Sequence, residues 1–338
     1  MDSRLPAGKL PKDLLVSLLD RYAKPTAGVV LGARVGEDAA VLEIGGRYLV
    51  VSTDPITFAT REIGYYAVTV NANDVVTRGA TPHWFLMSLL LPEGGRDAEV
   101  EALFQQVDSA CRRLEVGLIG GHTEVTPGLD RPLLIGTMIG EVAKDRLVVT
   151  SGAEVGDDLI LTKGIAVEGT AILARDREGC LRRQGYPQEF IQRAQGHLYD
   201  PGISVVEEAL VAVRTVRVSA MHDPTEGGLS TGLYELSEAA EVGLEVEQAK
   251  IPILPETRRL CEEFHLDPLG LIASGALLIT CRPDDTGALL MAIREAGVAV
   301  QHIGRVVPQE RGVVLSSPEG ERPFPVFQRD EIVKIFEE

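Results

Sequence analysis

Strand-like and helix-like segments alternate along the whole chain, with short connections between them. Leu14, Leu15 and Leu18 recur at the spacing of one helix face, whereas the run from His83 to Leu91 has the length and composition of a buried strand. The patterns predict helices over 10–22, 61–78, 97–114, 166–176, 203–213, 229–240, 255–264 and 284–296, and strands over 39–44, 48–52, 83–91, 118–119, 133–142, 158–162, 218–221, 276–280 and 301–307. This alternation is typical of a mixed α/β or α+β fold.

The length of the chain indicates more than one domain. Its 338 residues are too many for one small domain and sufficient for two. The segment 144–157 contains Ser151-Gly152-Ala153 and Val155-Gly156-Asp157, and small and glycine residues in this density are typical of a connection. We therefore predict an N-terminal domain over 1–150 and a C-terminal domain over 151–338.

Charge and cysteine content exclude several classes of protein. The 50 acidic and 33 basic side chains give a formal net charge of −17, which repels nucleic-acid backbones and anionic lipid. A nucleotide remains compatible with this charge, because a divalent cation can bridge carboxylates to phosphates. The longest apolar run, around Trp84 to Leu91, is too short to span a membrane. The four cysteines form no CxxC pair, and no signal-peptide pattern is visible, so we expect a cytoplasmic protein with free thiols.

Four polar clusters interrupt otherwise apolar segments. They are Gly36-Glu37-Asp38 before a strand, Ser52-Thr53-Asp54 at the end of the next strand, Asn71 to Asp74 inside a helix, and His222 to Gly228 at a strand-to-helix turn. Each cluster also has a purely structural interpretation. Asp38 could cap a turn, Asp54 could end a strand before Pro55, the helical group could face solvent, and Asp223 could cap the following helix.

Taken together, the clusters favour a binding site. Carboxylates at strand ends suit a hard cation such as Mg²⁺, and nearby glycine turns let backbone N–H groups approach phosphate oxygens. The sequence contains no GxxxxGK[ST] segment and no GxGxxG segment. A phosphate site in this chain would therefore be of another kind.

In order and spacing, these clusters resemble the motifs of the AIR synthase superfamily. The matching segments are Gly36-Glu37-Asp38-Ala39-Ala40-Val41, Thr53-Asp54, Asn73-Asp74 with Arg78-Gly79-Ala80-Thr81-Pro82, Gly120-Gly121-His122-Thr123-Glu124-Val125, and Met221-His222-Asp223-Pro224-Thr225-Glu226-Gly227-Gly228. The last segment and the stretches around Ile251-Pro252 and Ser274-Gly275 are most similar to the HypE-like hydrogenase-maturation members. The resemblance covers nearly the whole chain.

The resemblance implies a fold, a cofactor and a set of site residues. It implies a two-domain α+β protein whose N-terminal domains join as a dimeric β-barrel, with a ferredoxin-like C-terminal domain and ATP in a groove at the dimer interface. By the same resemblance, Mg²⁺ would be held by Asp38, Asp54, Asp74 and Asp223. ATP would also contact Asp38, Asn73, Gly120, Gly121, Thr123, Thr225, Gly227 and Gly228. Catalytic roles would fall to Asp54, Asn73 and His122.

Two departures from the HypE-like pattern leave the activity open. The sequence ends at Phe336-Glu337-Glu338, where those relatives carry a terminal cysteine that accepts a carbamoyl group. His122 stands where they usually carry an acid, and it could act as an acid or base or be a structural histidine in a glycine loop. One expectation is an enzyme that uses the γ-phosphate of ATP to activate an oxygen of an unidentified small acceptor. The alternative is a maturation subunit that binds nucleotide and a protein partner without the terminal-cysteine chemistry.

Overall fold

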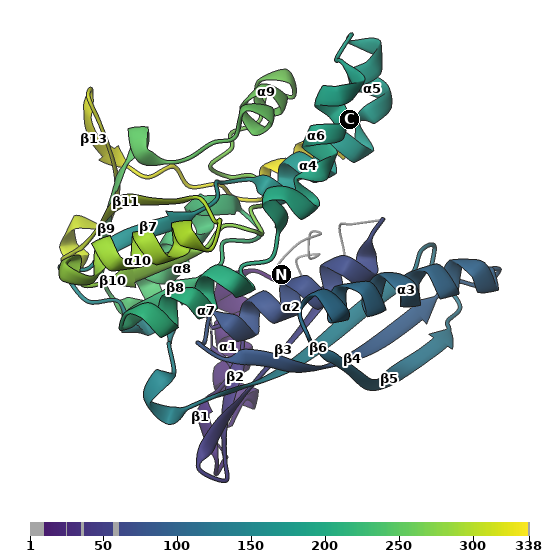
Figure 1. The fold of residues 1–338 in the computed structure, drawn as a ribbon, viewed down its shortest axis with the longest axis horizontal. Coiled ribbons are helices and arrows are strands. Elements are labelled where there is room, and N and C mark those ends of the chain that lie inside the picture. Colours follow the sequence, from purple (N-terminus) through teal and green to yellow (C-terminus); the bar gives the residue numbers. More distant parts are fainter. Residues whose placement is uncertain (1–9, 25, 35–36, 57–60, 337–338) are drawn as a thin grey trace.

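The computed structural model describes residues 10–24, 26–34, 37–56 and 61–336, and they form two mixed sheets with helices packed on them (Figure 1). The mixed α/β class predicted from the sequence is confirmed. Glycine Gly36 of the first polar cluster and the last two residues, Glu337 and Glu338, lie outside the described residues. Among the described residues, the structure has no helix that is long and apolar enough to cross a membrane.

The N-terminal sheet has six strands in the order β1-β2-β3-β6-β4-β5. The elements of this half are α1 (Lys12–Tyr22), β1 (Val29–Leu31), β2 (Ala40–Ile44), β3 (Arg47–Ile56), α2 (Ile63–Val76), β4 (Thr81–Leu91), α3 (Asp97–Arg113), β5 (Gly117–Val125) and β6 (Leu133–Val142). Strand β5 pairs with β4 in parallel, and the other pairs are antiparallel. The single chain leaves β1 and β5 as the two edges, so the dimeric barrel stays a prediction.

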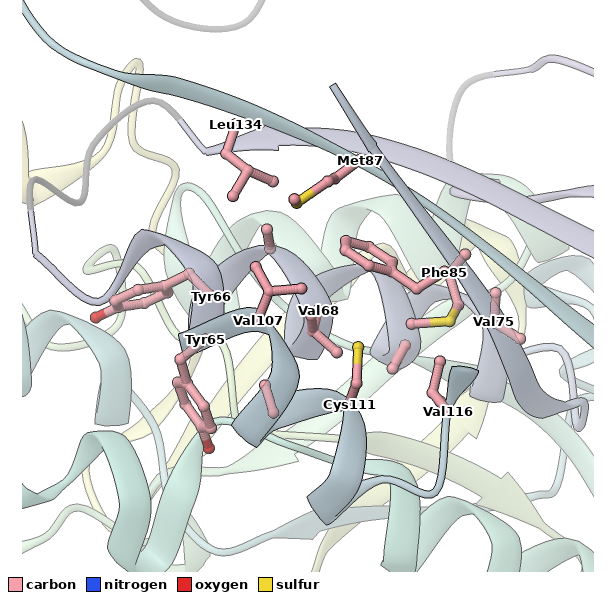
Figure 2. Close-up of a cluster of buried hydrophobic side chains, with 14 of the residues drawn as sticks. Tyr65, Tyr66, Val68, Val75, Phe85, Met87, Val107, Cys111, Val116 and Leu134 are labelled. Atoms are coloured by element: carbon pink, nitrogen blue, oxygen red, sulfur yellow. The ribbon is translucent and has the colours of Figure 1, made fainter. Parts of the chain in front are cut away.

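Helix α2 is the central element of the N-terminal half, and all of its residues are buried. It lies between the sheet on one side and α3 and α7 (Val206–Thr215) on the others. Figure 2 shows the apolar cluster that joins α2, α3 and the sheet, with Val68, Phe85, Val107 and Leu134 among its members. A Cβ atom at Gly136 of β6 would collide with the side chain of Asn71, so this glycine allows the helix to approach the sheet closely.

The C-terminal sheet has seven strands in the order β13-β12-β9-β11-β7-β10-β8. The elements of this half are β7 (Asp158–Thr162), α4 (Val167–Asp176), α5 (Glu178–Arg183), α6 (Gln188–Gly196), α7, β8 (Val218–His222), α8 (Gly228–Ala240), β9 (Gly243–Glu247), α9 (Pro255–Glu263), β10 (Leu278–Cys281), α10 (Pro283–Glu295), β11 (Val300–Val307), β12 (Val313–Ser317) and β13 (Gly320–Pro323). Helix α8 leaves the end of β8 through the turn 223–227, which brings that turn to the end of an edge strand.

Strand β5 extends beyond the two residues predicted for it. It runs in register with β4 from Trp84 opposite Gly117 to Leu91 opposite Val125, so His122 lies in a strand and not in a glycine loop. All residues of β5 are exposed in the single chain. On the sheet face opposite α2, Trp84, Leu86 and Ile139 are only half buried. An apolar face and an open edge therefore remain uncovered within the described residues.

Candidate functional site

Three acidic segments that are distant in the sequence meet where the two halves of the chain touch. Ligand atoms of Asp38, His222 and Asp223 all lie within 4.8 Å of one another. Asp74 of α2 belongs to the same cluster, because the charges of Asp223, Asp38 and Asp54 all raise its pKa. Of the four carboxylates predicted to hold a cation, Asp38 and Asp223 lie together, and Asp54 and Asp74 are near enough for their charges to interact with them.

Asp74 is held in place inside the protein. Its Oδ2 accepts a hydrogen bond of 2.5 Å from the hydroxyl of Ser52, and its side chain is buried. Burial raises the pKa of Asp74 well above its usual value, and the neighbouring carboxylates raise it further, whereas the Ser52 hydrogen bond opposes them. A proton or a cation must therefore compensate the charge in this cluster.

Asp223 follows directly after β8 and is also buried. Neither of its carboxylate oxygens accepts a hydrogen bond from another described residue. Burial raises the pKa of Asp223, the charge of Asp38 raises it further, and His222 and Arg78 lower it. Because buried carboxylate oxygens without partners are costly, this donor set fits a bound divalent cation.

His222 lies between two acids. Its Nε2 atom is 2.9 Å from Oε2 of Glu235 on α8, and its Nδ1 atom is 3.6 Å from Oδ2 of Asp38. Burial lowers the pKa of His222, but the Glu235 hydrogen bond and the charge of Asp38 outweigh it, so the pKa is raised. The sequence pattern indicated no role for His222 or Glu235, because thirteen positions separate the histidine from its helical partner.

A buried ion pair anchors the segment that carries Asp38. The guanidinium of Arg78 donates to Glu37, and the side chains of both residues are fully buried. Oε2 of Glu37 also accepts a hydrogen bond of 3.2 Å from the hydroxyl of Thr150. Arg78 follows α2 and Thr150 lies in the connection between the two halves, so this contact fixes the position of Asp38 relative to both. Sequence spacing gave no signal for it.

The turn 225–228 is closed by contacts within the chain. Gly227 and Gly228 both have positive φ, and the N–H of Gly227 donates to Oδ2 of Asp330 at 2.6 Å. The N–H of Gly228 donates to the carbonyl of Thr225 at 3.0 Å. Burial raises the pKa of Asp330 to about 6, although three backbone N–H groups lower it. Phosphate contacts from Thr225, Gly227 and Gly228 stay a prediction, since the chain itself engages both N–H groups.

The two asparagines of α2 have structural contacts. Asn71 accepts a hydrogen bond of 2.9 Å from the N–H of Asp54. The side chain of Asn73 donates to the carbonyl of Ile203 at 2.8 Å and accepts from the N–H of Val205 at 2.9 Å. Asn73 therefore joins α2 to the segment before α7. Its predicted contact with phosphate remains untested, and Asp54, half buried on β3, stays a candidate.

Gly120, Gly121, His122 and Thr123 were predicted to contact the nucleotide, but within one chain they lie away from the acidic cluster. They belong to β5, which is separated from β2 by β3, β6 and β4. At a spacing of about 4.8 Å between neighbouring strands, β2 and β5 are about 19 Å apart across the sheet. The exposed side chain of His122 instead pairs with Glu124 at 3.0 Å. One chain alone does not bring His122 to the acidic cluster.

Comparison with known proteins places the chain among well-defined relatives. The model of the AIR synthase related protein N-terminal domain matches residues 36–142, and that of the C-terminal domain matches residues 154–316. Carbamoyl dehydratase HypE of Cupriavidus necator is 32% identical over 83% of this chain and 80% of its own length. HypE of Rhodobacter capsulatus is 30% identical over 91% of this chain and 88% of its own length. A crystal structure of the hydrogenase maturation protein HypE in complex with ATP aligns with a TM-score of 0.72 and 25% identity, covering 97% of this chain and 98% of that chain.

Proposed function

The chain belongs to the AIR synthase-related family, in its HypE-like branch, and from that premise we propose that it binds ATP with Mg²⁺ and uses the γ-phosphate to activate an oxygen atom of a small acceptor. The observation that carries the proposal is the convergence of Asp38, Asp74 and Asp223, with both oxygens of Asp223 unpaired within the described residues. The ATP complex of a HypE relative supports the choice of nucleotide.

The residues of the cluster have distinct tasks in this proposal. Asp38 and Asp223 bind the cation, Ser52 orients Asp74, and Arg78 positions Asp38 through Glu37. Asp54, half buried on β3, is a further cation ligand. Bound Mg²⁺ supplies neutralisation of phosphate charge and Lewis acidity. The remaining work of the protein is positioning, because phosphoryl transfer depends mainly on alignment and charge stabilisation.

We further propose that the site is completed by a second copy of the chain. The exposed edge strand β5 and the half-buried apolar face beside it are the surfaces that a second N-terminal sheet would cover. Such pairing offers a route by which Gly120, Gly121, His122 and Thr123 could reach the nucleotide of the partner. It would also remove an unprotected strand edge, which isolated proteins rarely leave open.

The dimer is tested by placing a charge on that edge. Ile119 is 56% exposed on β5, so Ile119→Glu is expected to convert the dimer to a monomer at micromolar concentration. The matched control is Met291→Glu, because Met291 is 60% exposed on α10 of the other half. Light scattering should give twice the chain mass for the wild type and the control. A wild type that is monomeric at high concentration contradicts the shared site.

A second candidate function is a role in hydrogenase maturation, because similar proteins are described as hydrogenase-maturation proteins. The chain could serve hydrogenase maturation as a nucleotide-binding subunit that works with another protein. Three of its four thiols are poorly suited to accept a group, because burial raises the pKa of Cys111, Cys261 and Cys281 to about 11, 12 and 11. The thiolate is the reactive form of cysteine. These three cysteines are therefore expected to stay unmodified, which leaves the half-buried Cys180 as the thiol to follow by mass.

One experiment separates the two functions. The protein is incubated with ATP and Mg²⁺, with pools of small acceptors or with a carbamoyl-donor system, and ADP release and intact mass are followed. We expect acceptor-dependent ADP release that EDTA abolishes, with no ATP-dependent gain of mass. A mass gain on a cysteine would show that the chain carries the group itself. ATP binding without turnover in any pool would favour the subunit function.

A further inference from the structure

We propose that Nδ1 of His222 is a direct ligand of the cation at the Asp38–Asp223 site, and that this site therefore prefers first-row transition dications of the Mn²⁺ and Co²⁺ class to Mg²⁺. The inference rests on the proposed function only in placing a cation among these residues. It adds a nitrogen ligand to a site that the sequence patterns describe as all-oxygen.

The distances are compatible with a single ion. Nδ1 of His222 lies 3.6 Å from Oδ2 of Asp38, and the ligand atoms of Asp38, His222 and Asp223 lie within 4.8 Å of one another. Two ligands bound at about 2.1 Å to one ion are at most about 4.2 Å apart. Three ligands of one ion are at most about 3.6 Å from one another if they are evenly spaced, so side-chain shifts of up to about 1 Å would close the site.

The polar atoms that face this point lack other partners. The side chain of His222 is 3% exposed, and its Nδ1 accepts no hydrogen bond from the described residues. Both oxygens of Asp223, which is 2% exposed, are in the same situation. Buried polar atoms without a partner cost free energy. One cation would satisfy all three atoms at once. These unpaired buried atoms point to a bound cation, whereas a cluster of acidic residues alone would not.

Glu235 gives the imidazole the orientation of a metal ligand. Its Oε2 lies 2.9 Å from Nε2 of His222, on the side of the ring opposite Asp38. A carboxylate at this position holds the proton on Nε2 and leaves the lone pair on Nδ1 free to bind metal. Glu235 is thus a positioning residue for the proposed ligand.

The ligand set determines the preferred metal. Mg²⁺ favours oxygen ligands and retains several waters, whereas imidazole nitrogen binds more strongly to later first-row ions. A histidine with two carboxylates should therefore raise the affinity for Co²⁺ much more than the affinity for Mg²⁺. The competing explanation is that a protonated His222 forms ion pairs with Asp38 and Glu235 and never binds metal.

Pulsed EPR of the Mn²⁺-loaded protein distinguishes the two explanations. The chain is prepared without a histidine tag, and inorganic tripolyphosphate replaces ATP because it contains no nitrogen. We expect a ¹⁴N coupling of directly bound imidazole that changes to the ¹⁵N pattern when the histidines are ¹⁵N-labelled. His222→Asn, which offers an oxygen near the Nδ1 position, should lose the coupling. His302→Gln, which removes a histidine on β11, should retain it.

Metal titration supplies an independent readout. His222→Asn is expected to weaken Co²⁺ binding about 10-fold or more while Mg²⁺ binding changes less than about 3-fold. Glu235→Gln should weaken Co²⁺ binding by about 10-fold, because Glu235 orients the imidazole of His222 whose Nδ1 binds the metal. Stoichiometric Mn²⁺ without ¹⁴N coupling in the wild type would overturn this inference and leave the proposed function intact. Failure of any divalent cation to bind would instead overturn the proposed function.

Discussion

Replacing Arg78 with leucine is expected to lower the free energy of unfolding by about 3–5 kcal/mol. The side chains of Arg78 and Glu37 are both fully buried, so the substitution leaves the Glu37 carboxylate uncompensated in the interior. Only the hydroxyl of Thr150 would remain to bind it. Denaturant unfolding of wild type and variant measures the difference.

Two further variants test the mechanism of this loss. Arg96→Leu removes an exposed arginine that pairs with Glu99, and we expect it to change the free energy of unfolding little, because water screens this pair. A double variant, Glu37→Met with Arg78→Leu, should be more stable than Arg78→Leu alone, because it leaves no unpaired charge in the interior. An effect of Arg78→Leu as small as that of Arg96→Leu would contradict the buried ion pair.

Asp223→Asn is expected to make the metal-free protein more stable and to remove its cation-dependent nucleotide binding. The pKa values of Asp223 and Asp74 are raised in the folded protein, chiefly by burial and then by neighbouring carboxylates. As pH rises above the unfolded value of about 3.9, the unfolded state loses these protons first, so folded stability falls. Neutralising Asp223 should recover at least about 1 kcal/mol at neutral pH, the value of one pKa unit.

The pH dependence of melting tests this account. In EDTA, the melting temperature of the wild type should fall between pH 5 and pH 8, and it should fall less for Asp223→Asn. Saturating Mg²⁺ should flatten the wild-type profile, because the cation replaces the protons. Asp130→Asn, in an exposed turn, is the matched control and should follow the wild type. A lower stability of metal-free Asp223→Asn would show that the carboxylate is stabilising there.

The sequence allowed the fold class and the acidic cluster to be predicted for physical reasons. The apolar patterns located α2 and β4 to within two residues at each end, whereas β3 runs four residues beyond the predicted strand 48–52, so Asp54 lies inside it. Asp38 and Asp223 stand at strand ends, where side chains from distant segments can meet. Short or charged elements were missed, including β1, β9, β12, β13, α5 and α6.

Other features depend on long-range contacts that a single sequence does not reveal. The helical Asn/Asp group looked compatible with solvent exposure, yet α2 is buried on all sides by the sheet, α3 and α7. Arg78 contacts Glu37 across 41 positions, and Asp330 contacts Gly227 across 103. The glycines Gly227 and Gly228 looked like a phosphate cradle, whereas a Cβ at Gly228 would collide with the backbone of Leu271, so packing alone requires that glycine.

Isothermal titration with a non-hydrolysable ATP analogue tests the central claim most directly. The wild type is titrated in the presence of Mg²⁺ and again in EDTA, and Asp223→Asn is titrated in the same way. The proposed site predicts tight binding only with wild type and Mg²⁺, and at least about 10-fold weaker binding when either the cation or the carboxylate is removed. Equal affinity in all four titrations would contradict a cation-dependent nucleotide site at Asp38, Asp74 and Asp223.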